Sequence, residues 1–316
     1  MTIDLTGPAL MDRPKILVIT GPTATGKTAL GALLAKTLGG EVVSADSMQV
    51  YRHMDIGTAK PTKDEMLGVP HHMIDIITPW EDYSVAQYVA DAVSCIEEIL
   101  GQGKKPLLVG GTGLYIDSLL SGRSFSARGD ATLRRKLENE YNETGGEAML
   151  IRLAEFDPDS AVKLYANDKK RIVRALEAYI VTGKTISQHD RETMALPPRY
   201  DATKIALTYS DRAELYARID RRVDSMLLRG LEEEVRSLLD MGVLPESTAM
   251  QAIGYKEMVG VIRGESSLEA ATEKIKMESR RYAKRQLTWL RRDSAIQWIT
   301  WEREPDIEGT AGRMCK

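Results

Sequence analysis

The chain has 316 residues, 43% of them hydrophobic, and a formal net charge of −3, so it can fold around a core, and any nucleic-acid site must be a local basic patch. Its two cysteines, Cys95 and Cys315, are far apart, which argues against a disulfide scaffold or Cys-x-x-Cys metal site and favours a reducing compartment. No apolar stretch reaches the roughly 18 residues of a membrane span, so we expect a cytoplasmic protein without a membrane partner, and a monomer.

The first predicted element is a strand over residues 15–20, followed by a helix over residues 27–38. Between them stands a P-loop pattern, which consists of Gly21, Pro22, Thr23, Ala24, Thr25, Gly26, Lys27 and Thr28. In such a loop the backbone N–H groups and the helix N-terminus face a phosphate, and the lysine adds a positive charge. Thr28 is the candidate ligand of Mg²⁺. Nucleotide-binding proteins, ATP-binding ones included, share this pattern, so it does not by itself identify the phosphate compound.

A second strand is predicted over residues 41–45 and ends at Asp46. Because ligands bind beyond the carboxyl ends of parallel strands, we expect Asp46 beside the P-loop, where it can accept a proton or support Mg²⁺. The alternative is an aspartate that only caps a turn. Thr112 follows another strand, predicted over residues 106–109, and is either a hydroxyl near the ligand or a plain helix cap.

The remaining pattern alternates between strands and helices except in one segment. We predict a short strand over 73–77, helices over 84–100 and 114–120, and a strand over 204–209. Further helices are expected over 231–240, 248–259 and 268–292, before a last strand over 296–300. Residues 125–198 show only helical patterns, which begin near Asp130, Asp157 and Asn167 or Asp168.

These patterns predict an α/β fold, with a P-loop NTPase-like parallel sheet flanked by helices and an inserted all-helical subdomain. The predicted domains are a discontinuous core over 14–124 and 199–303, the insertion over 125–198, and flexible tails over 1–13 and 304–316.

Basic residues form three groups whose role the sequence leaves open. Arg218 and Arg222 lie four residues apart on a long helix predicted to start at Asp211. They either clamp an anion or, as is more common, face solvent. Two further clusters, over 169–174 and 280–292, either contact an RNA backbone or belong to charged helix faces in water.

Several segments in order resemble the bacterial tRNA dimethylallyltransferases, also called tRNA isopentenyltransferases or IPP transferases. They are residues 21–28, 44–51, 54–61, 108–115, 170–174, 251–256 and 283–291. The resemblance implies transfer of a dimethylallyl group from dimethylallyl diphosphate to N6 of the adenosine at tRNA position 37, next to the anticodon, with release of diphosphate. The P-loop would then hold the diphosphate with Mg²⁺, in contact with Thr23 and Arg222, and Asp46 would be the general base.

The resemblance also implies contacts to the tRNA anticodon stem-loop. The segment that reads the flipped adenine comprises Asp46, Ser47, Met48 and Gln49. Two single positions placed against the tRNA are Thr112 and Arg134. The other implied contacts are Lys170, Arg171, Ile172, Val173 and Arg174 in the insertion, and Gln251, Ala252, Ile253, Gly254, Tyr255 and Lys256.

Three other functions compete with RNA prenylation. An adenylate dimethylallyltransferase would prenylate a free nucleotide and would need no RNA-gripping insertion. A small-molecule P-loop kinase would need a strand ending in aspartate, but Gly110 and Gly111 stand at the end of the strand predicted over 106–109. A non-catalytic RNA-binding module would not need the P-loop together with Asp46.

Overall fold

The computed structural model of the chain describes residues 13–122 and 129–315. Its chain divides into two compact units, one made of the residues up to Leu120 together with those from Arg199 onward, and one over Ser121–Pro198. The insertion predicted over 125–198 therefore corresponds to a compact unit that starts a few residues earlier and ends at the same place.

The larger unit is built on a six-stranded sheet in which every pairing is parallel, in the order β3-β2-β4-β1-β5-β6. The strands are β1 (Lys15–Thr20), β2 (Gly40–Ala45), β3 (His71–His72), β4 (Lys105–Gly110), β5 (Asp201–Tyr209) and β6 (Gln297–Trp301). Strands β1, β2 and β4 are buried almost throughout, as their apolar runs predict for inner parallel strands.

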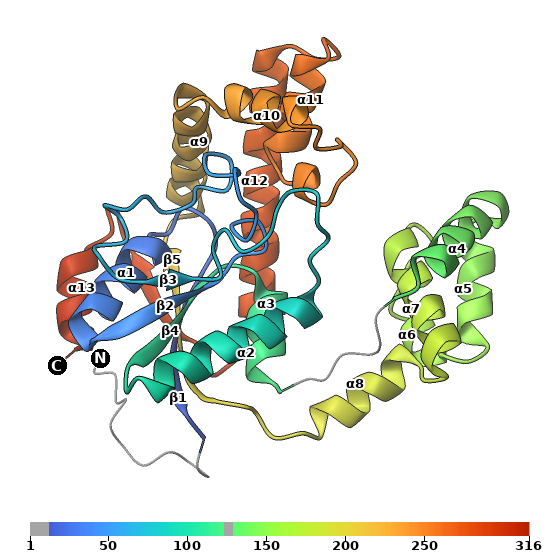
Figure 1. Cartoon of the computed structure of the whole chain (residues 1–316), viewed down its shortest axis with the longest axis horizontal. Helices are drawn as coiled ribbons and strands as arrows, with labels where there is room; N and C mark the ends of the chain where they lie inside the picture. The colour runs from blue at the N-terminus through green and yellow to red at the C-terminus, as the bar shows by residue number, and fades with distance from the viewer. Residues whose placement is uncertain (1–12, 123–128, 316) are drawn as a thin grey trace. The chain divides into compact units, whose positions relative to one another are not determined.

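Helices cover both faces of this sheet. Helices α1 (Lys27–Leu38) and α13 (Ile307–Met314) lie on one side, and α2 (Val85–Gly101) and α3 (Gly113–Leu120) on the other (Figure 1). A second apolar cluster is formed by α9 (Arg212–Leu228), α10 (Leu231–Asp240), α11 (Tyr255–Ile262) and α12 (Leu268–Leu290). The long helix α12 runs from this cluster to α3, so it passes along the edge of the sheet where the strands end (Figure 1).

The smaller unit consists of helices in its described part. These are α4 (Ala131–Thr144), α5 (Gly146–Ala154), α6 (Pro158–Ala161), α7 (Lys169–Thr182) and α8 (Ile186–Met194). Asp130 caps α4 by accepting hydrogen bonds from two backbone N–H groups, and Gly183 ends α7 in the left-handed conformation, as predicted. Leu137, Leu153 and Leu176 are buried in a separate core of this unit.

Two predicted elements are wrong in detail because of backbone conformation. No strand is formed over the described residues 73–77, and the short strand β3 lies just before them. Met73 and Asp75 have φ angles of 63° and 57°, which an extended strand excludes. The helix expected over 248–259 is divided at Gly254, whose φ is 98°. A short 3₁₀ helix, Ala249–Gln251, precedes this break and α11 follows it.

The prediction of a flexible C-terminal tail over 304–316 is also wrong. Residues 307–314 form α13, whose Ala311 and Met314 are buried in the main core against α1. A Cβ atom on Gly26 would lie 3.2 Å from the Ile307 side chain, so this segment packs against the glycine-rich loop. Of the N-terminal tail predicted over 1–13, residues 1–12 lie outside the described residues. Across the described chain, none of the helices has the length and apolar character needed to span a membrane.

Candidate active site

The carboxyl ends of β1, β2 and β4 open onto one cavity of about 420 Å³. The glycine-rich loop (residues 21–28), the turn after β2, and helices α9 and α12 contribute to its wall. The predicted site residues that line it are Thr23, Lys27, Thr28, Asp46, Ser47, Met48, Gln49, Arg222, Gln251, Ala252, Ile253 and Lys256. Segments that are far apart in the sequence therefore meet at this edge of the sheet.

The conformation of the glycine-rich loop is fixed by contacts on the side that faces away from the cavity. Gly21 has a φ of 139°, and a Cβ atom there would lie 2.4 Å from the carbonyl oxygen of Leu207, so only glycine fits. The buried Thr25 hydroxyl donates to the Pro22 carbonyl at 2.9 Å. The indole N–H of Trp301 donates to the Thr25 carbonyl at 3.0 Å. Packing from β5 and β6 thus fixes the loop, and its other side faces the cavity.

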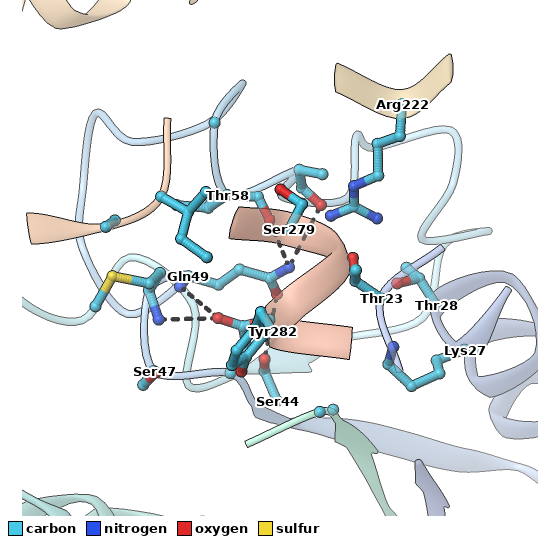
Figure 2. A pocket seen from close by; sticks show the side chains of 18 of the residues that line it. Thr23, Lys27, Thr28, Ser44, Ser47, Gln49, Thr58, Arg222, Ser279 and Tyr282 are labelled. Carbon is cyan, nitrogen blue, oxygen red and sulfur yellow. Dashed lines mark hydrogen bonds between the residues drawn. The ribbon is translucent and has the colours of Figure 1, made fainter. Parts of the chain in front are cut away.

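Cationic side chains gather at one end of the cavity. Figure 2 shows Thr23, Thr28, Lys27 and Arg222 together on one side, with Gln49 and Tyr282 on the other. Burial, and next the neighbouring Arg222, lower the pKa of Lys27 to about 7, against an opposing effect of Asp46. Because two buried cationic groups repel each other here, binding of an anion between them is strongly favoured.

The Lys27 ammonium has a protein partner in this structure. Its Nζ donates to the Pro22 carbonyl at 2.7 Å, within the loop itself. A phosphate entering the loop offers a charged acceptor in place of that neutral one. Burial also lowers the pKa of Arg222, and Asp46 opposes this shift.

The arginines Arg218 and Arg222 of α9 both line a smaller pocket beside Ala24 and Gly26, and of the two only Arg222 also lines the main cavity. Arg222 lines the cavity, whereas Arg218 pairs with Glu304 at 2.6 Å and lies over the Tyr209 ring at 5.4 Å. The anion-clamp interpretation therefore applies to Arg222, and Arg218 belongs to the partly exposed ion pairs of the surface.

Asp46 sits in a tight turn directly after β2. Its Oδ1 accepts the backbone N–H groups of Met48 at 2.9 Å and Gln49 at 3.3 Å. The Ser47 N–H donates to the Thr112 hydroxyl at 3.1 Å, which ties this turn to the loop after β4. Of the two carboxylate oxygens of Asp46, only Oδ1 accepts a hydrogen bond from the described part of the chain. Oδ2 is therefore the oxygen through which the carboxylate can take a proton.

Gln49 uses its side-chain amide within the protein. Its Oε1 accepts the Ser44 hydroxyl at 3.3 Å, and its Nε2 donates to the carbonyls of Thr58 and Ala59 at 3.4 and 3.3 Å. The amide therefore fixes the loop over residues 57–59, which also lines the cavity. A contact between Gln49 and an adenine stays a prediction.

The segment 251–256 has four residues that line the cavity and two that hold its conformation. Gln251, Ala252, Ile253 and Lys256 line the cavity. By contrast, Tyr255 is buried and its hydroxyl donates to Glu234 at 2.5 Å, while the Gly254 N–H donates to Glu257 at 2.9 Å. Gly254 and Tyr255 thus fix the conformation of the segment, and its other four residues face the cavity.

Helix α12 contributes cavity residues to which the sequence analysis assigned no individual role. These are Ser279, Tyr282, Arg285 and Gln286, which follow one another at intervals of three or four residues (Arg285 and Gln286 both after Tyr282) and so lie on one face. In the sequence, this region stands out as a basic cluster over 280–292 and as part of the family resemblance over 283–291. Among its arginines, Arg280 pairs with Asp220 at 2.5 Å and Arg281 with Glu278 at 2.7 Å. The spacing of the polar residues with Ile275 was the available signal that this helix has a face toward the site.

The implied RNA-binding residues of the smaller unit differ in exposure. Lys170 and Arg171 are exposed at the start of α7. Arg134 and Arg174 each pair at 3.0 Å with a buried glutamate, Glu177. Ile172 and Val173 are buried in the core of the unit, so the basic members of this segment are the ones whose side chains face outward.

The chemistry of the donor set is compatible with Mg²⁺. Thr28 and Asp46 both line the cavity, and no group of three or more His, Cys, Asp or Glu side chains able to hold a metal occurs in residues 13–122 and 129–315. Mg²⁺ commonly takes one or two protein ligands and completes its shell with phosphate oxygens and water. A hydroxyl beside a phosphate cradle fits that mode.

Comparison with known proteins identifies the family. The family model described as IPP transferase matches residues 49–293, and that described as isopentenyl transferase matches residues 14–76. The chain belongs to the IPP transferase family.

Individual relatives of this IPP transferase cover nearly the whole chain. It is 49% identical over 285 residues to a tRNA dimethylallyltransferase of Acetivibrio thermocellus, covering 90% of this chain and 91% of the relative. The tRNA dimethylallyltransferase 1 of Pelobacter propionicus is 47% identical over 311 residues, which is 98% of each chain.

Two solved structures share this fold. The full-length tRNA isopentenylpyrophosphate transferase of Bacillus halodurans aligns with a TM-score of 0.70 and 42% identity over 94% of both chains. A eukaryotic dimethylallyltransferase described as acting on tRNA aligns with a TM-score of 0.78 and 33% identity, over 90% of this chain and 73% of that one. These alignments confirm the predicted fold class.

Proposed function

We propose that this protein transfers a dimethylallyl group from dimethylallyl diphosphate to N6 of the adenosine that follows the tRNA anticodon, at position 37, and releases diphosphate. The observation that carries the proposal is the shared cavity, which holds a cationic phosphate cradle at one end and the Asp46 carboxylate at its wall. The names of the family relatives, tRNA dimethylallyltransferases, support the acceptor and the transferred group.

The cationic end suits a diphosphate leaving group. As the allylic carbon–oxygen bond breaks, negative charge grows on the diphosphate, and Lys27, Arg222 and the loop N–H groups stabilise it where it develops. Mg²⁺, held by Thr28 and the phosphate oxygens, would supply further charge neutralisation. The Thr23 hydroxyl lies at the same end and is placed to donate to a phosphate oxygen.

Asp46 suits the acceptor end. An exocyclic adenine amine is a weak nucleophile, so it must be held close to the donor carbon and lose its proton as the new carbon–nitrogen bond forms. The adenine reaches an enclosed cavity only when it is flipped out of the RNA, which costs least in a single-stranded loop. The exposed Lys170 and Arg171 would bind the phosphates of that stem-loop.

Incubation with labelled dimethylallyl diphosphate and either tRNA or AMP tests this function directly. Label in tRNA, recovered as N6-prenyladenosine at position 37, supports the proposal. Label only in AMP would identify an adenylate dimethylallyltransferase, and phosphoryl transfer from ATP would identify a kinase. In cells lacking the protein, mass spectrometry of tRNA nucleosides should show loss of the prenyladenosine.

Donor binding should depend on pH because of Lys27. With its pKa lowered to about 7, the free protein is mostly charged at this site below pH 7 and loses the charge above it. An anionic donor raises that pKa again, so binding at pH 8 should take up close to one proton. Titration calorimetry of dimethylallyl diphosphate, without tRNA, in buffers of different ionisation enthalpy measures this uptake. A Lys27→Met variant should show none, and equal heats in all buffers for the wild type would contradict the assignment.

Replacing Lys170 and Arg171 together by alanine should weaken tRNA binding in a salt-dependent way. Loss of about two phosphate contacts should reduce the slope of log affinity against log salt by about 1–2. Filter binding over a salt series provides the measurement, with the exposed pair Lys63 and Lys136 replaced in the same way as a control for net charge. An unchanged slope would assign Lys170 and Arg171 to a solvated face.

A further inference from the structure

Gln286 on α12 spans the two loops that form the floor of the cavity. Its Oε1 accepts the backbone N–H of Thr23 at 3.0 Å, and its Nε2 donates to the carbonyl of Gly111 at 2.8 Å. The residue is only 7% exposed, so both bonds are shielded from water. One side-chain amide therefore joins the glycine-rich loop to the loop after β4.

The fit between Gln286 and these loops is close. A Cβ atom on Gly111 would lie 2.3 Å from Gln286 Nε2 and 3.4 Å from the Gly21 carbonyl oxygen. The absence of a side chain at Gly111 thus lets the amide reach its backbone. An amide supplies an acceptor and a donor on one planar group without any change of protonation, so at neutral pH glutamine matches both partners and an ionised glutamate does not.

The bridge continues from Gly111 to the catalytic carboxylate. The next residue, Thr112, accepts the N–H of Ser47, which directly follows Asp46. The Tyr282 side chain, one turn before Gln286 on α12, interacts with the Thr112 hydroxyl. Helix α12 therefore contacts the phosphate cradle through Gln286 and the loop after β4 through Gln286 and Tyr282. Thr112 of that loop in turn holds the Asp46 turn.

We propose that Gln286 is a positioning residue for the transfer reaction, resting on the function proposed above. Its amide sets the spacing between the loop that holds the leaving diphosphate and the turn that carries the general base. The donor carbon and the attacking amine must meet within a few tenths of an ångström of the reactive distance, and a displacement of about 1 Å can cost about 100-fold in rate. Gln286 acts on this geometry through its bonds to the two loops.

Gln286→Met tests the proposal because methionine has a similar length and forms neither bond. We expect kcat to fall by about 10- to 100-fold, whereas the KM for tRNA and its Kd remain within about twofold. The matched control is Gln102→Met, at an exposed glutamine that ends α2. A variant that is folded by circular dichroism and retains kcat within twofold of wild type would overturn the proposal.

Gln286→Glu gives a signature that a purely structural role would not. A protonated glutamic acid imitates glutamine, since its C=O can accept from Thr23 and its O–H can donate to Gly111, whereas the carboxylate repels the Gly111 carbonyl. The ratio of its kcat to that of wild type should therefore rise about tenfold or more from pH 8 to pH 6. Division by the wild-type kcat removes the pH dependence that the two proteins share.

The outcomes separate the two proposals. A ratio for Gln286→Glu that stays flat with pH, like that of Gln286→Met, would overturn the amide bridge even if both variants were slow. If Gln286→Met does not fold, the pH profile of Gln286→Glu decides alone, measured on a sample that circular dichroism shows to be folded at both pH 6 and pH 8. Absence of transfer to tRNA by the wild-type protein would instead refute the proposed function.

Discussion

An Asp46→Asn variant should turn over about 10²–10⁴-fold more slowly than the wild type, with its affinity for tRNA little changed. Asparagine is the informative replacement because its side-chain oxygen can still accept the N–H groups of Met48 and Gln49, so the turn after β2 is kept. What it loses is the ability to take a proton from the adenine amine. Single-turnover transfer of labelled dimethylallyl groups to tRNA measures the rate, and filter binding measures the affinity.

The control for this variant is Asp211→Asn at the start of α9. There, too, Oδ1 accepts a backbone N–H, that of Ala213 at 2.8 Å, and asparagine can preserve the cap. We expect Asp211→Asn to be fully active, so that a loss seen only at Asp46 reports on proton transfer. Activity of Asp46→Asn close to wild type would remove Asp46 from the role of base, and a large drop in tRNA affinity would make it a binding residue instead.

The sheet and the position of Asp46 could be predicted from the sequence because both depend on local signals. Apolar runs mark the inner strands, and the residue at the end of a parallel strand must lie at the ligand-binding edge whatever the rest of the chain does. The same reasoning places Thr112 in the loop after β4. Its hydroxyl accepts a hydrogen bond from the Ser47 N–H, which joins this loop to the turn after β2.

The contributions of α12 and α13 could not be predicted in the same way. Which face of α12 points into the cavity depends on how it packs against α9 and α3, and its abundant arginines suggested a surface. The last residues looked like a tail because glycines and charges dilute their apolar content. Their helix is stabilised by contact with α1, a tertiary effect that the local pattern does not carry.

The remaining differences between predicted and observed elements come from backbone conformations that the residue types do not predict. Met73 and Asp75 both adopt positive φ angles, which an apolar residue such as Met73 seldom does, so the predicted strand begins two residues later than β3. Burial of the Tyr255 side chain in the second apolar cluster, with its hydroxyl on Glu234, likewise depends on a contact across α10 and α11.

A Lys27→Met variant should reduce the transfer rate by about 10²–10³-fold, the usual effect of removing one group that stabilises transition-state charge. Methionine keeps an unbranched apolar chain of similar length, so the packing of the lysine stem is retained while the ammonium is lost. Transfer is measured with saturating tRNA over a range of donor concentrations. The matched control is Lys36→Met on the exposed end of the same helix, for which we expect no change.

The stability of the Lys27→Met variant should move in the opposite direction from its activity. Since burial lowers the pKa of Lys27 from its usual value to about 7, the folded protein binds fewer protons there than the unfolded chain at pH 8, and the buried ammonium opposes folding. Removing it should leave the melting temperature unchanged or raise it. A variant that is both inactive and less stable would mean that Lys27 holds the loop together through Pro22, whereas an inactive but equally stable variant assigns its charge to the leaving diphosphate.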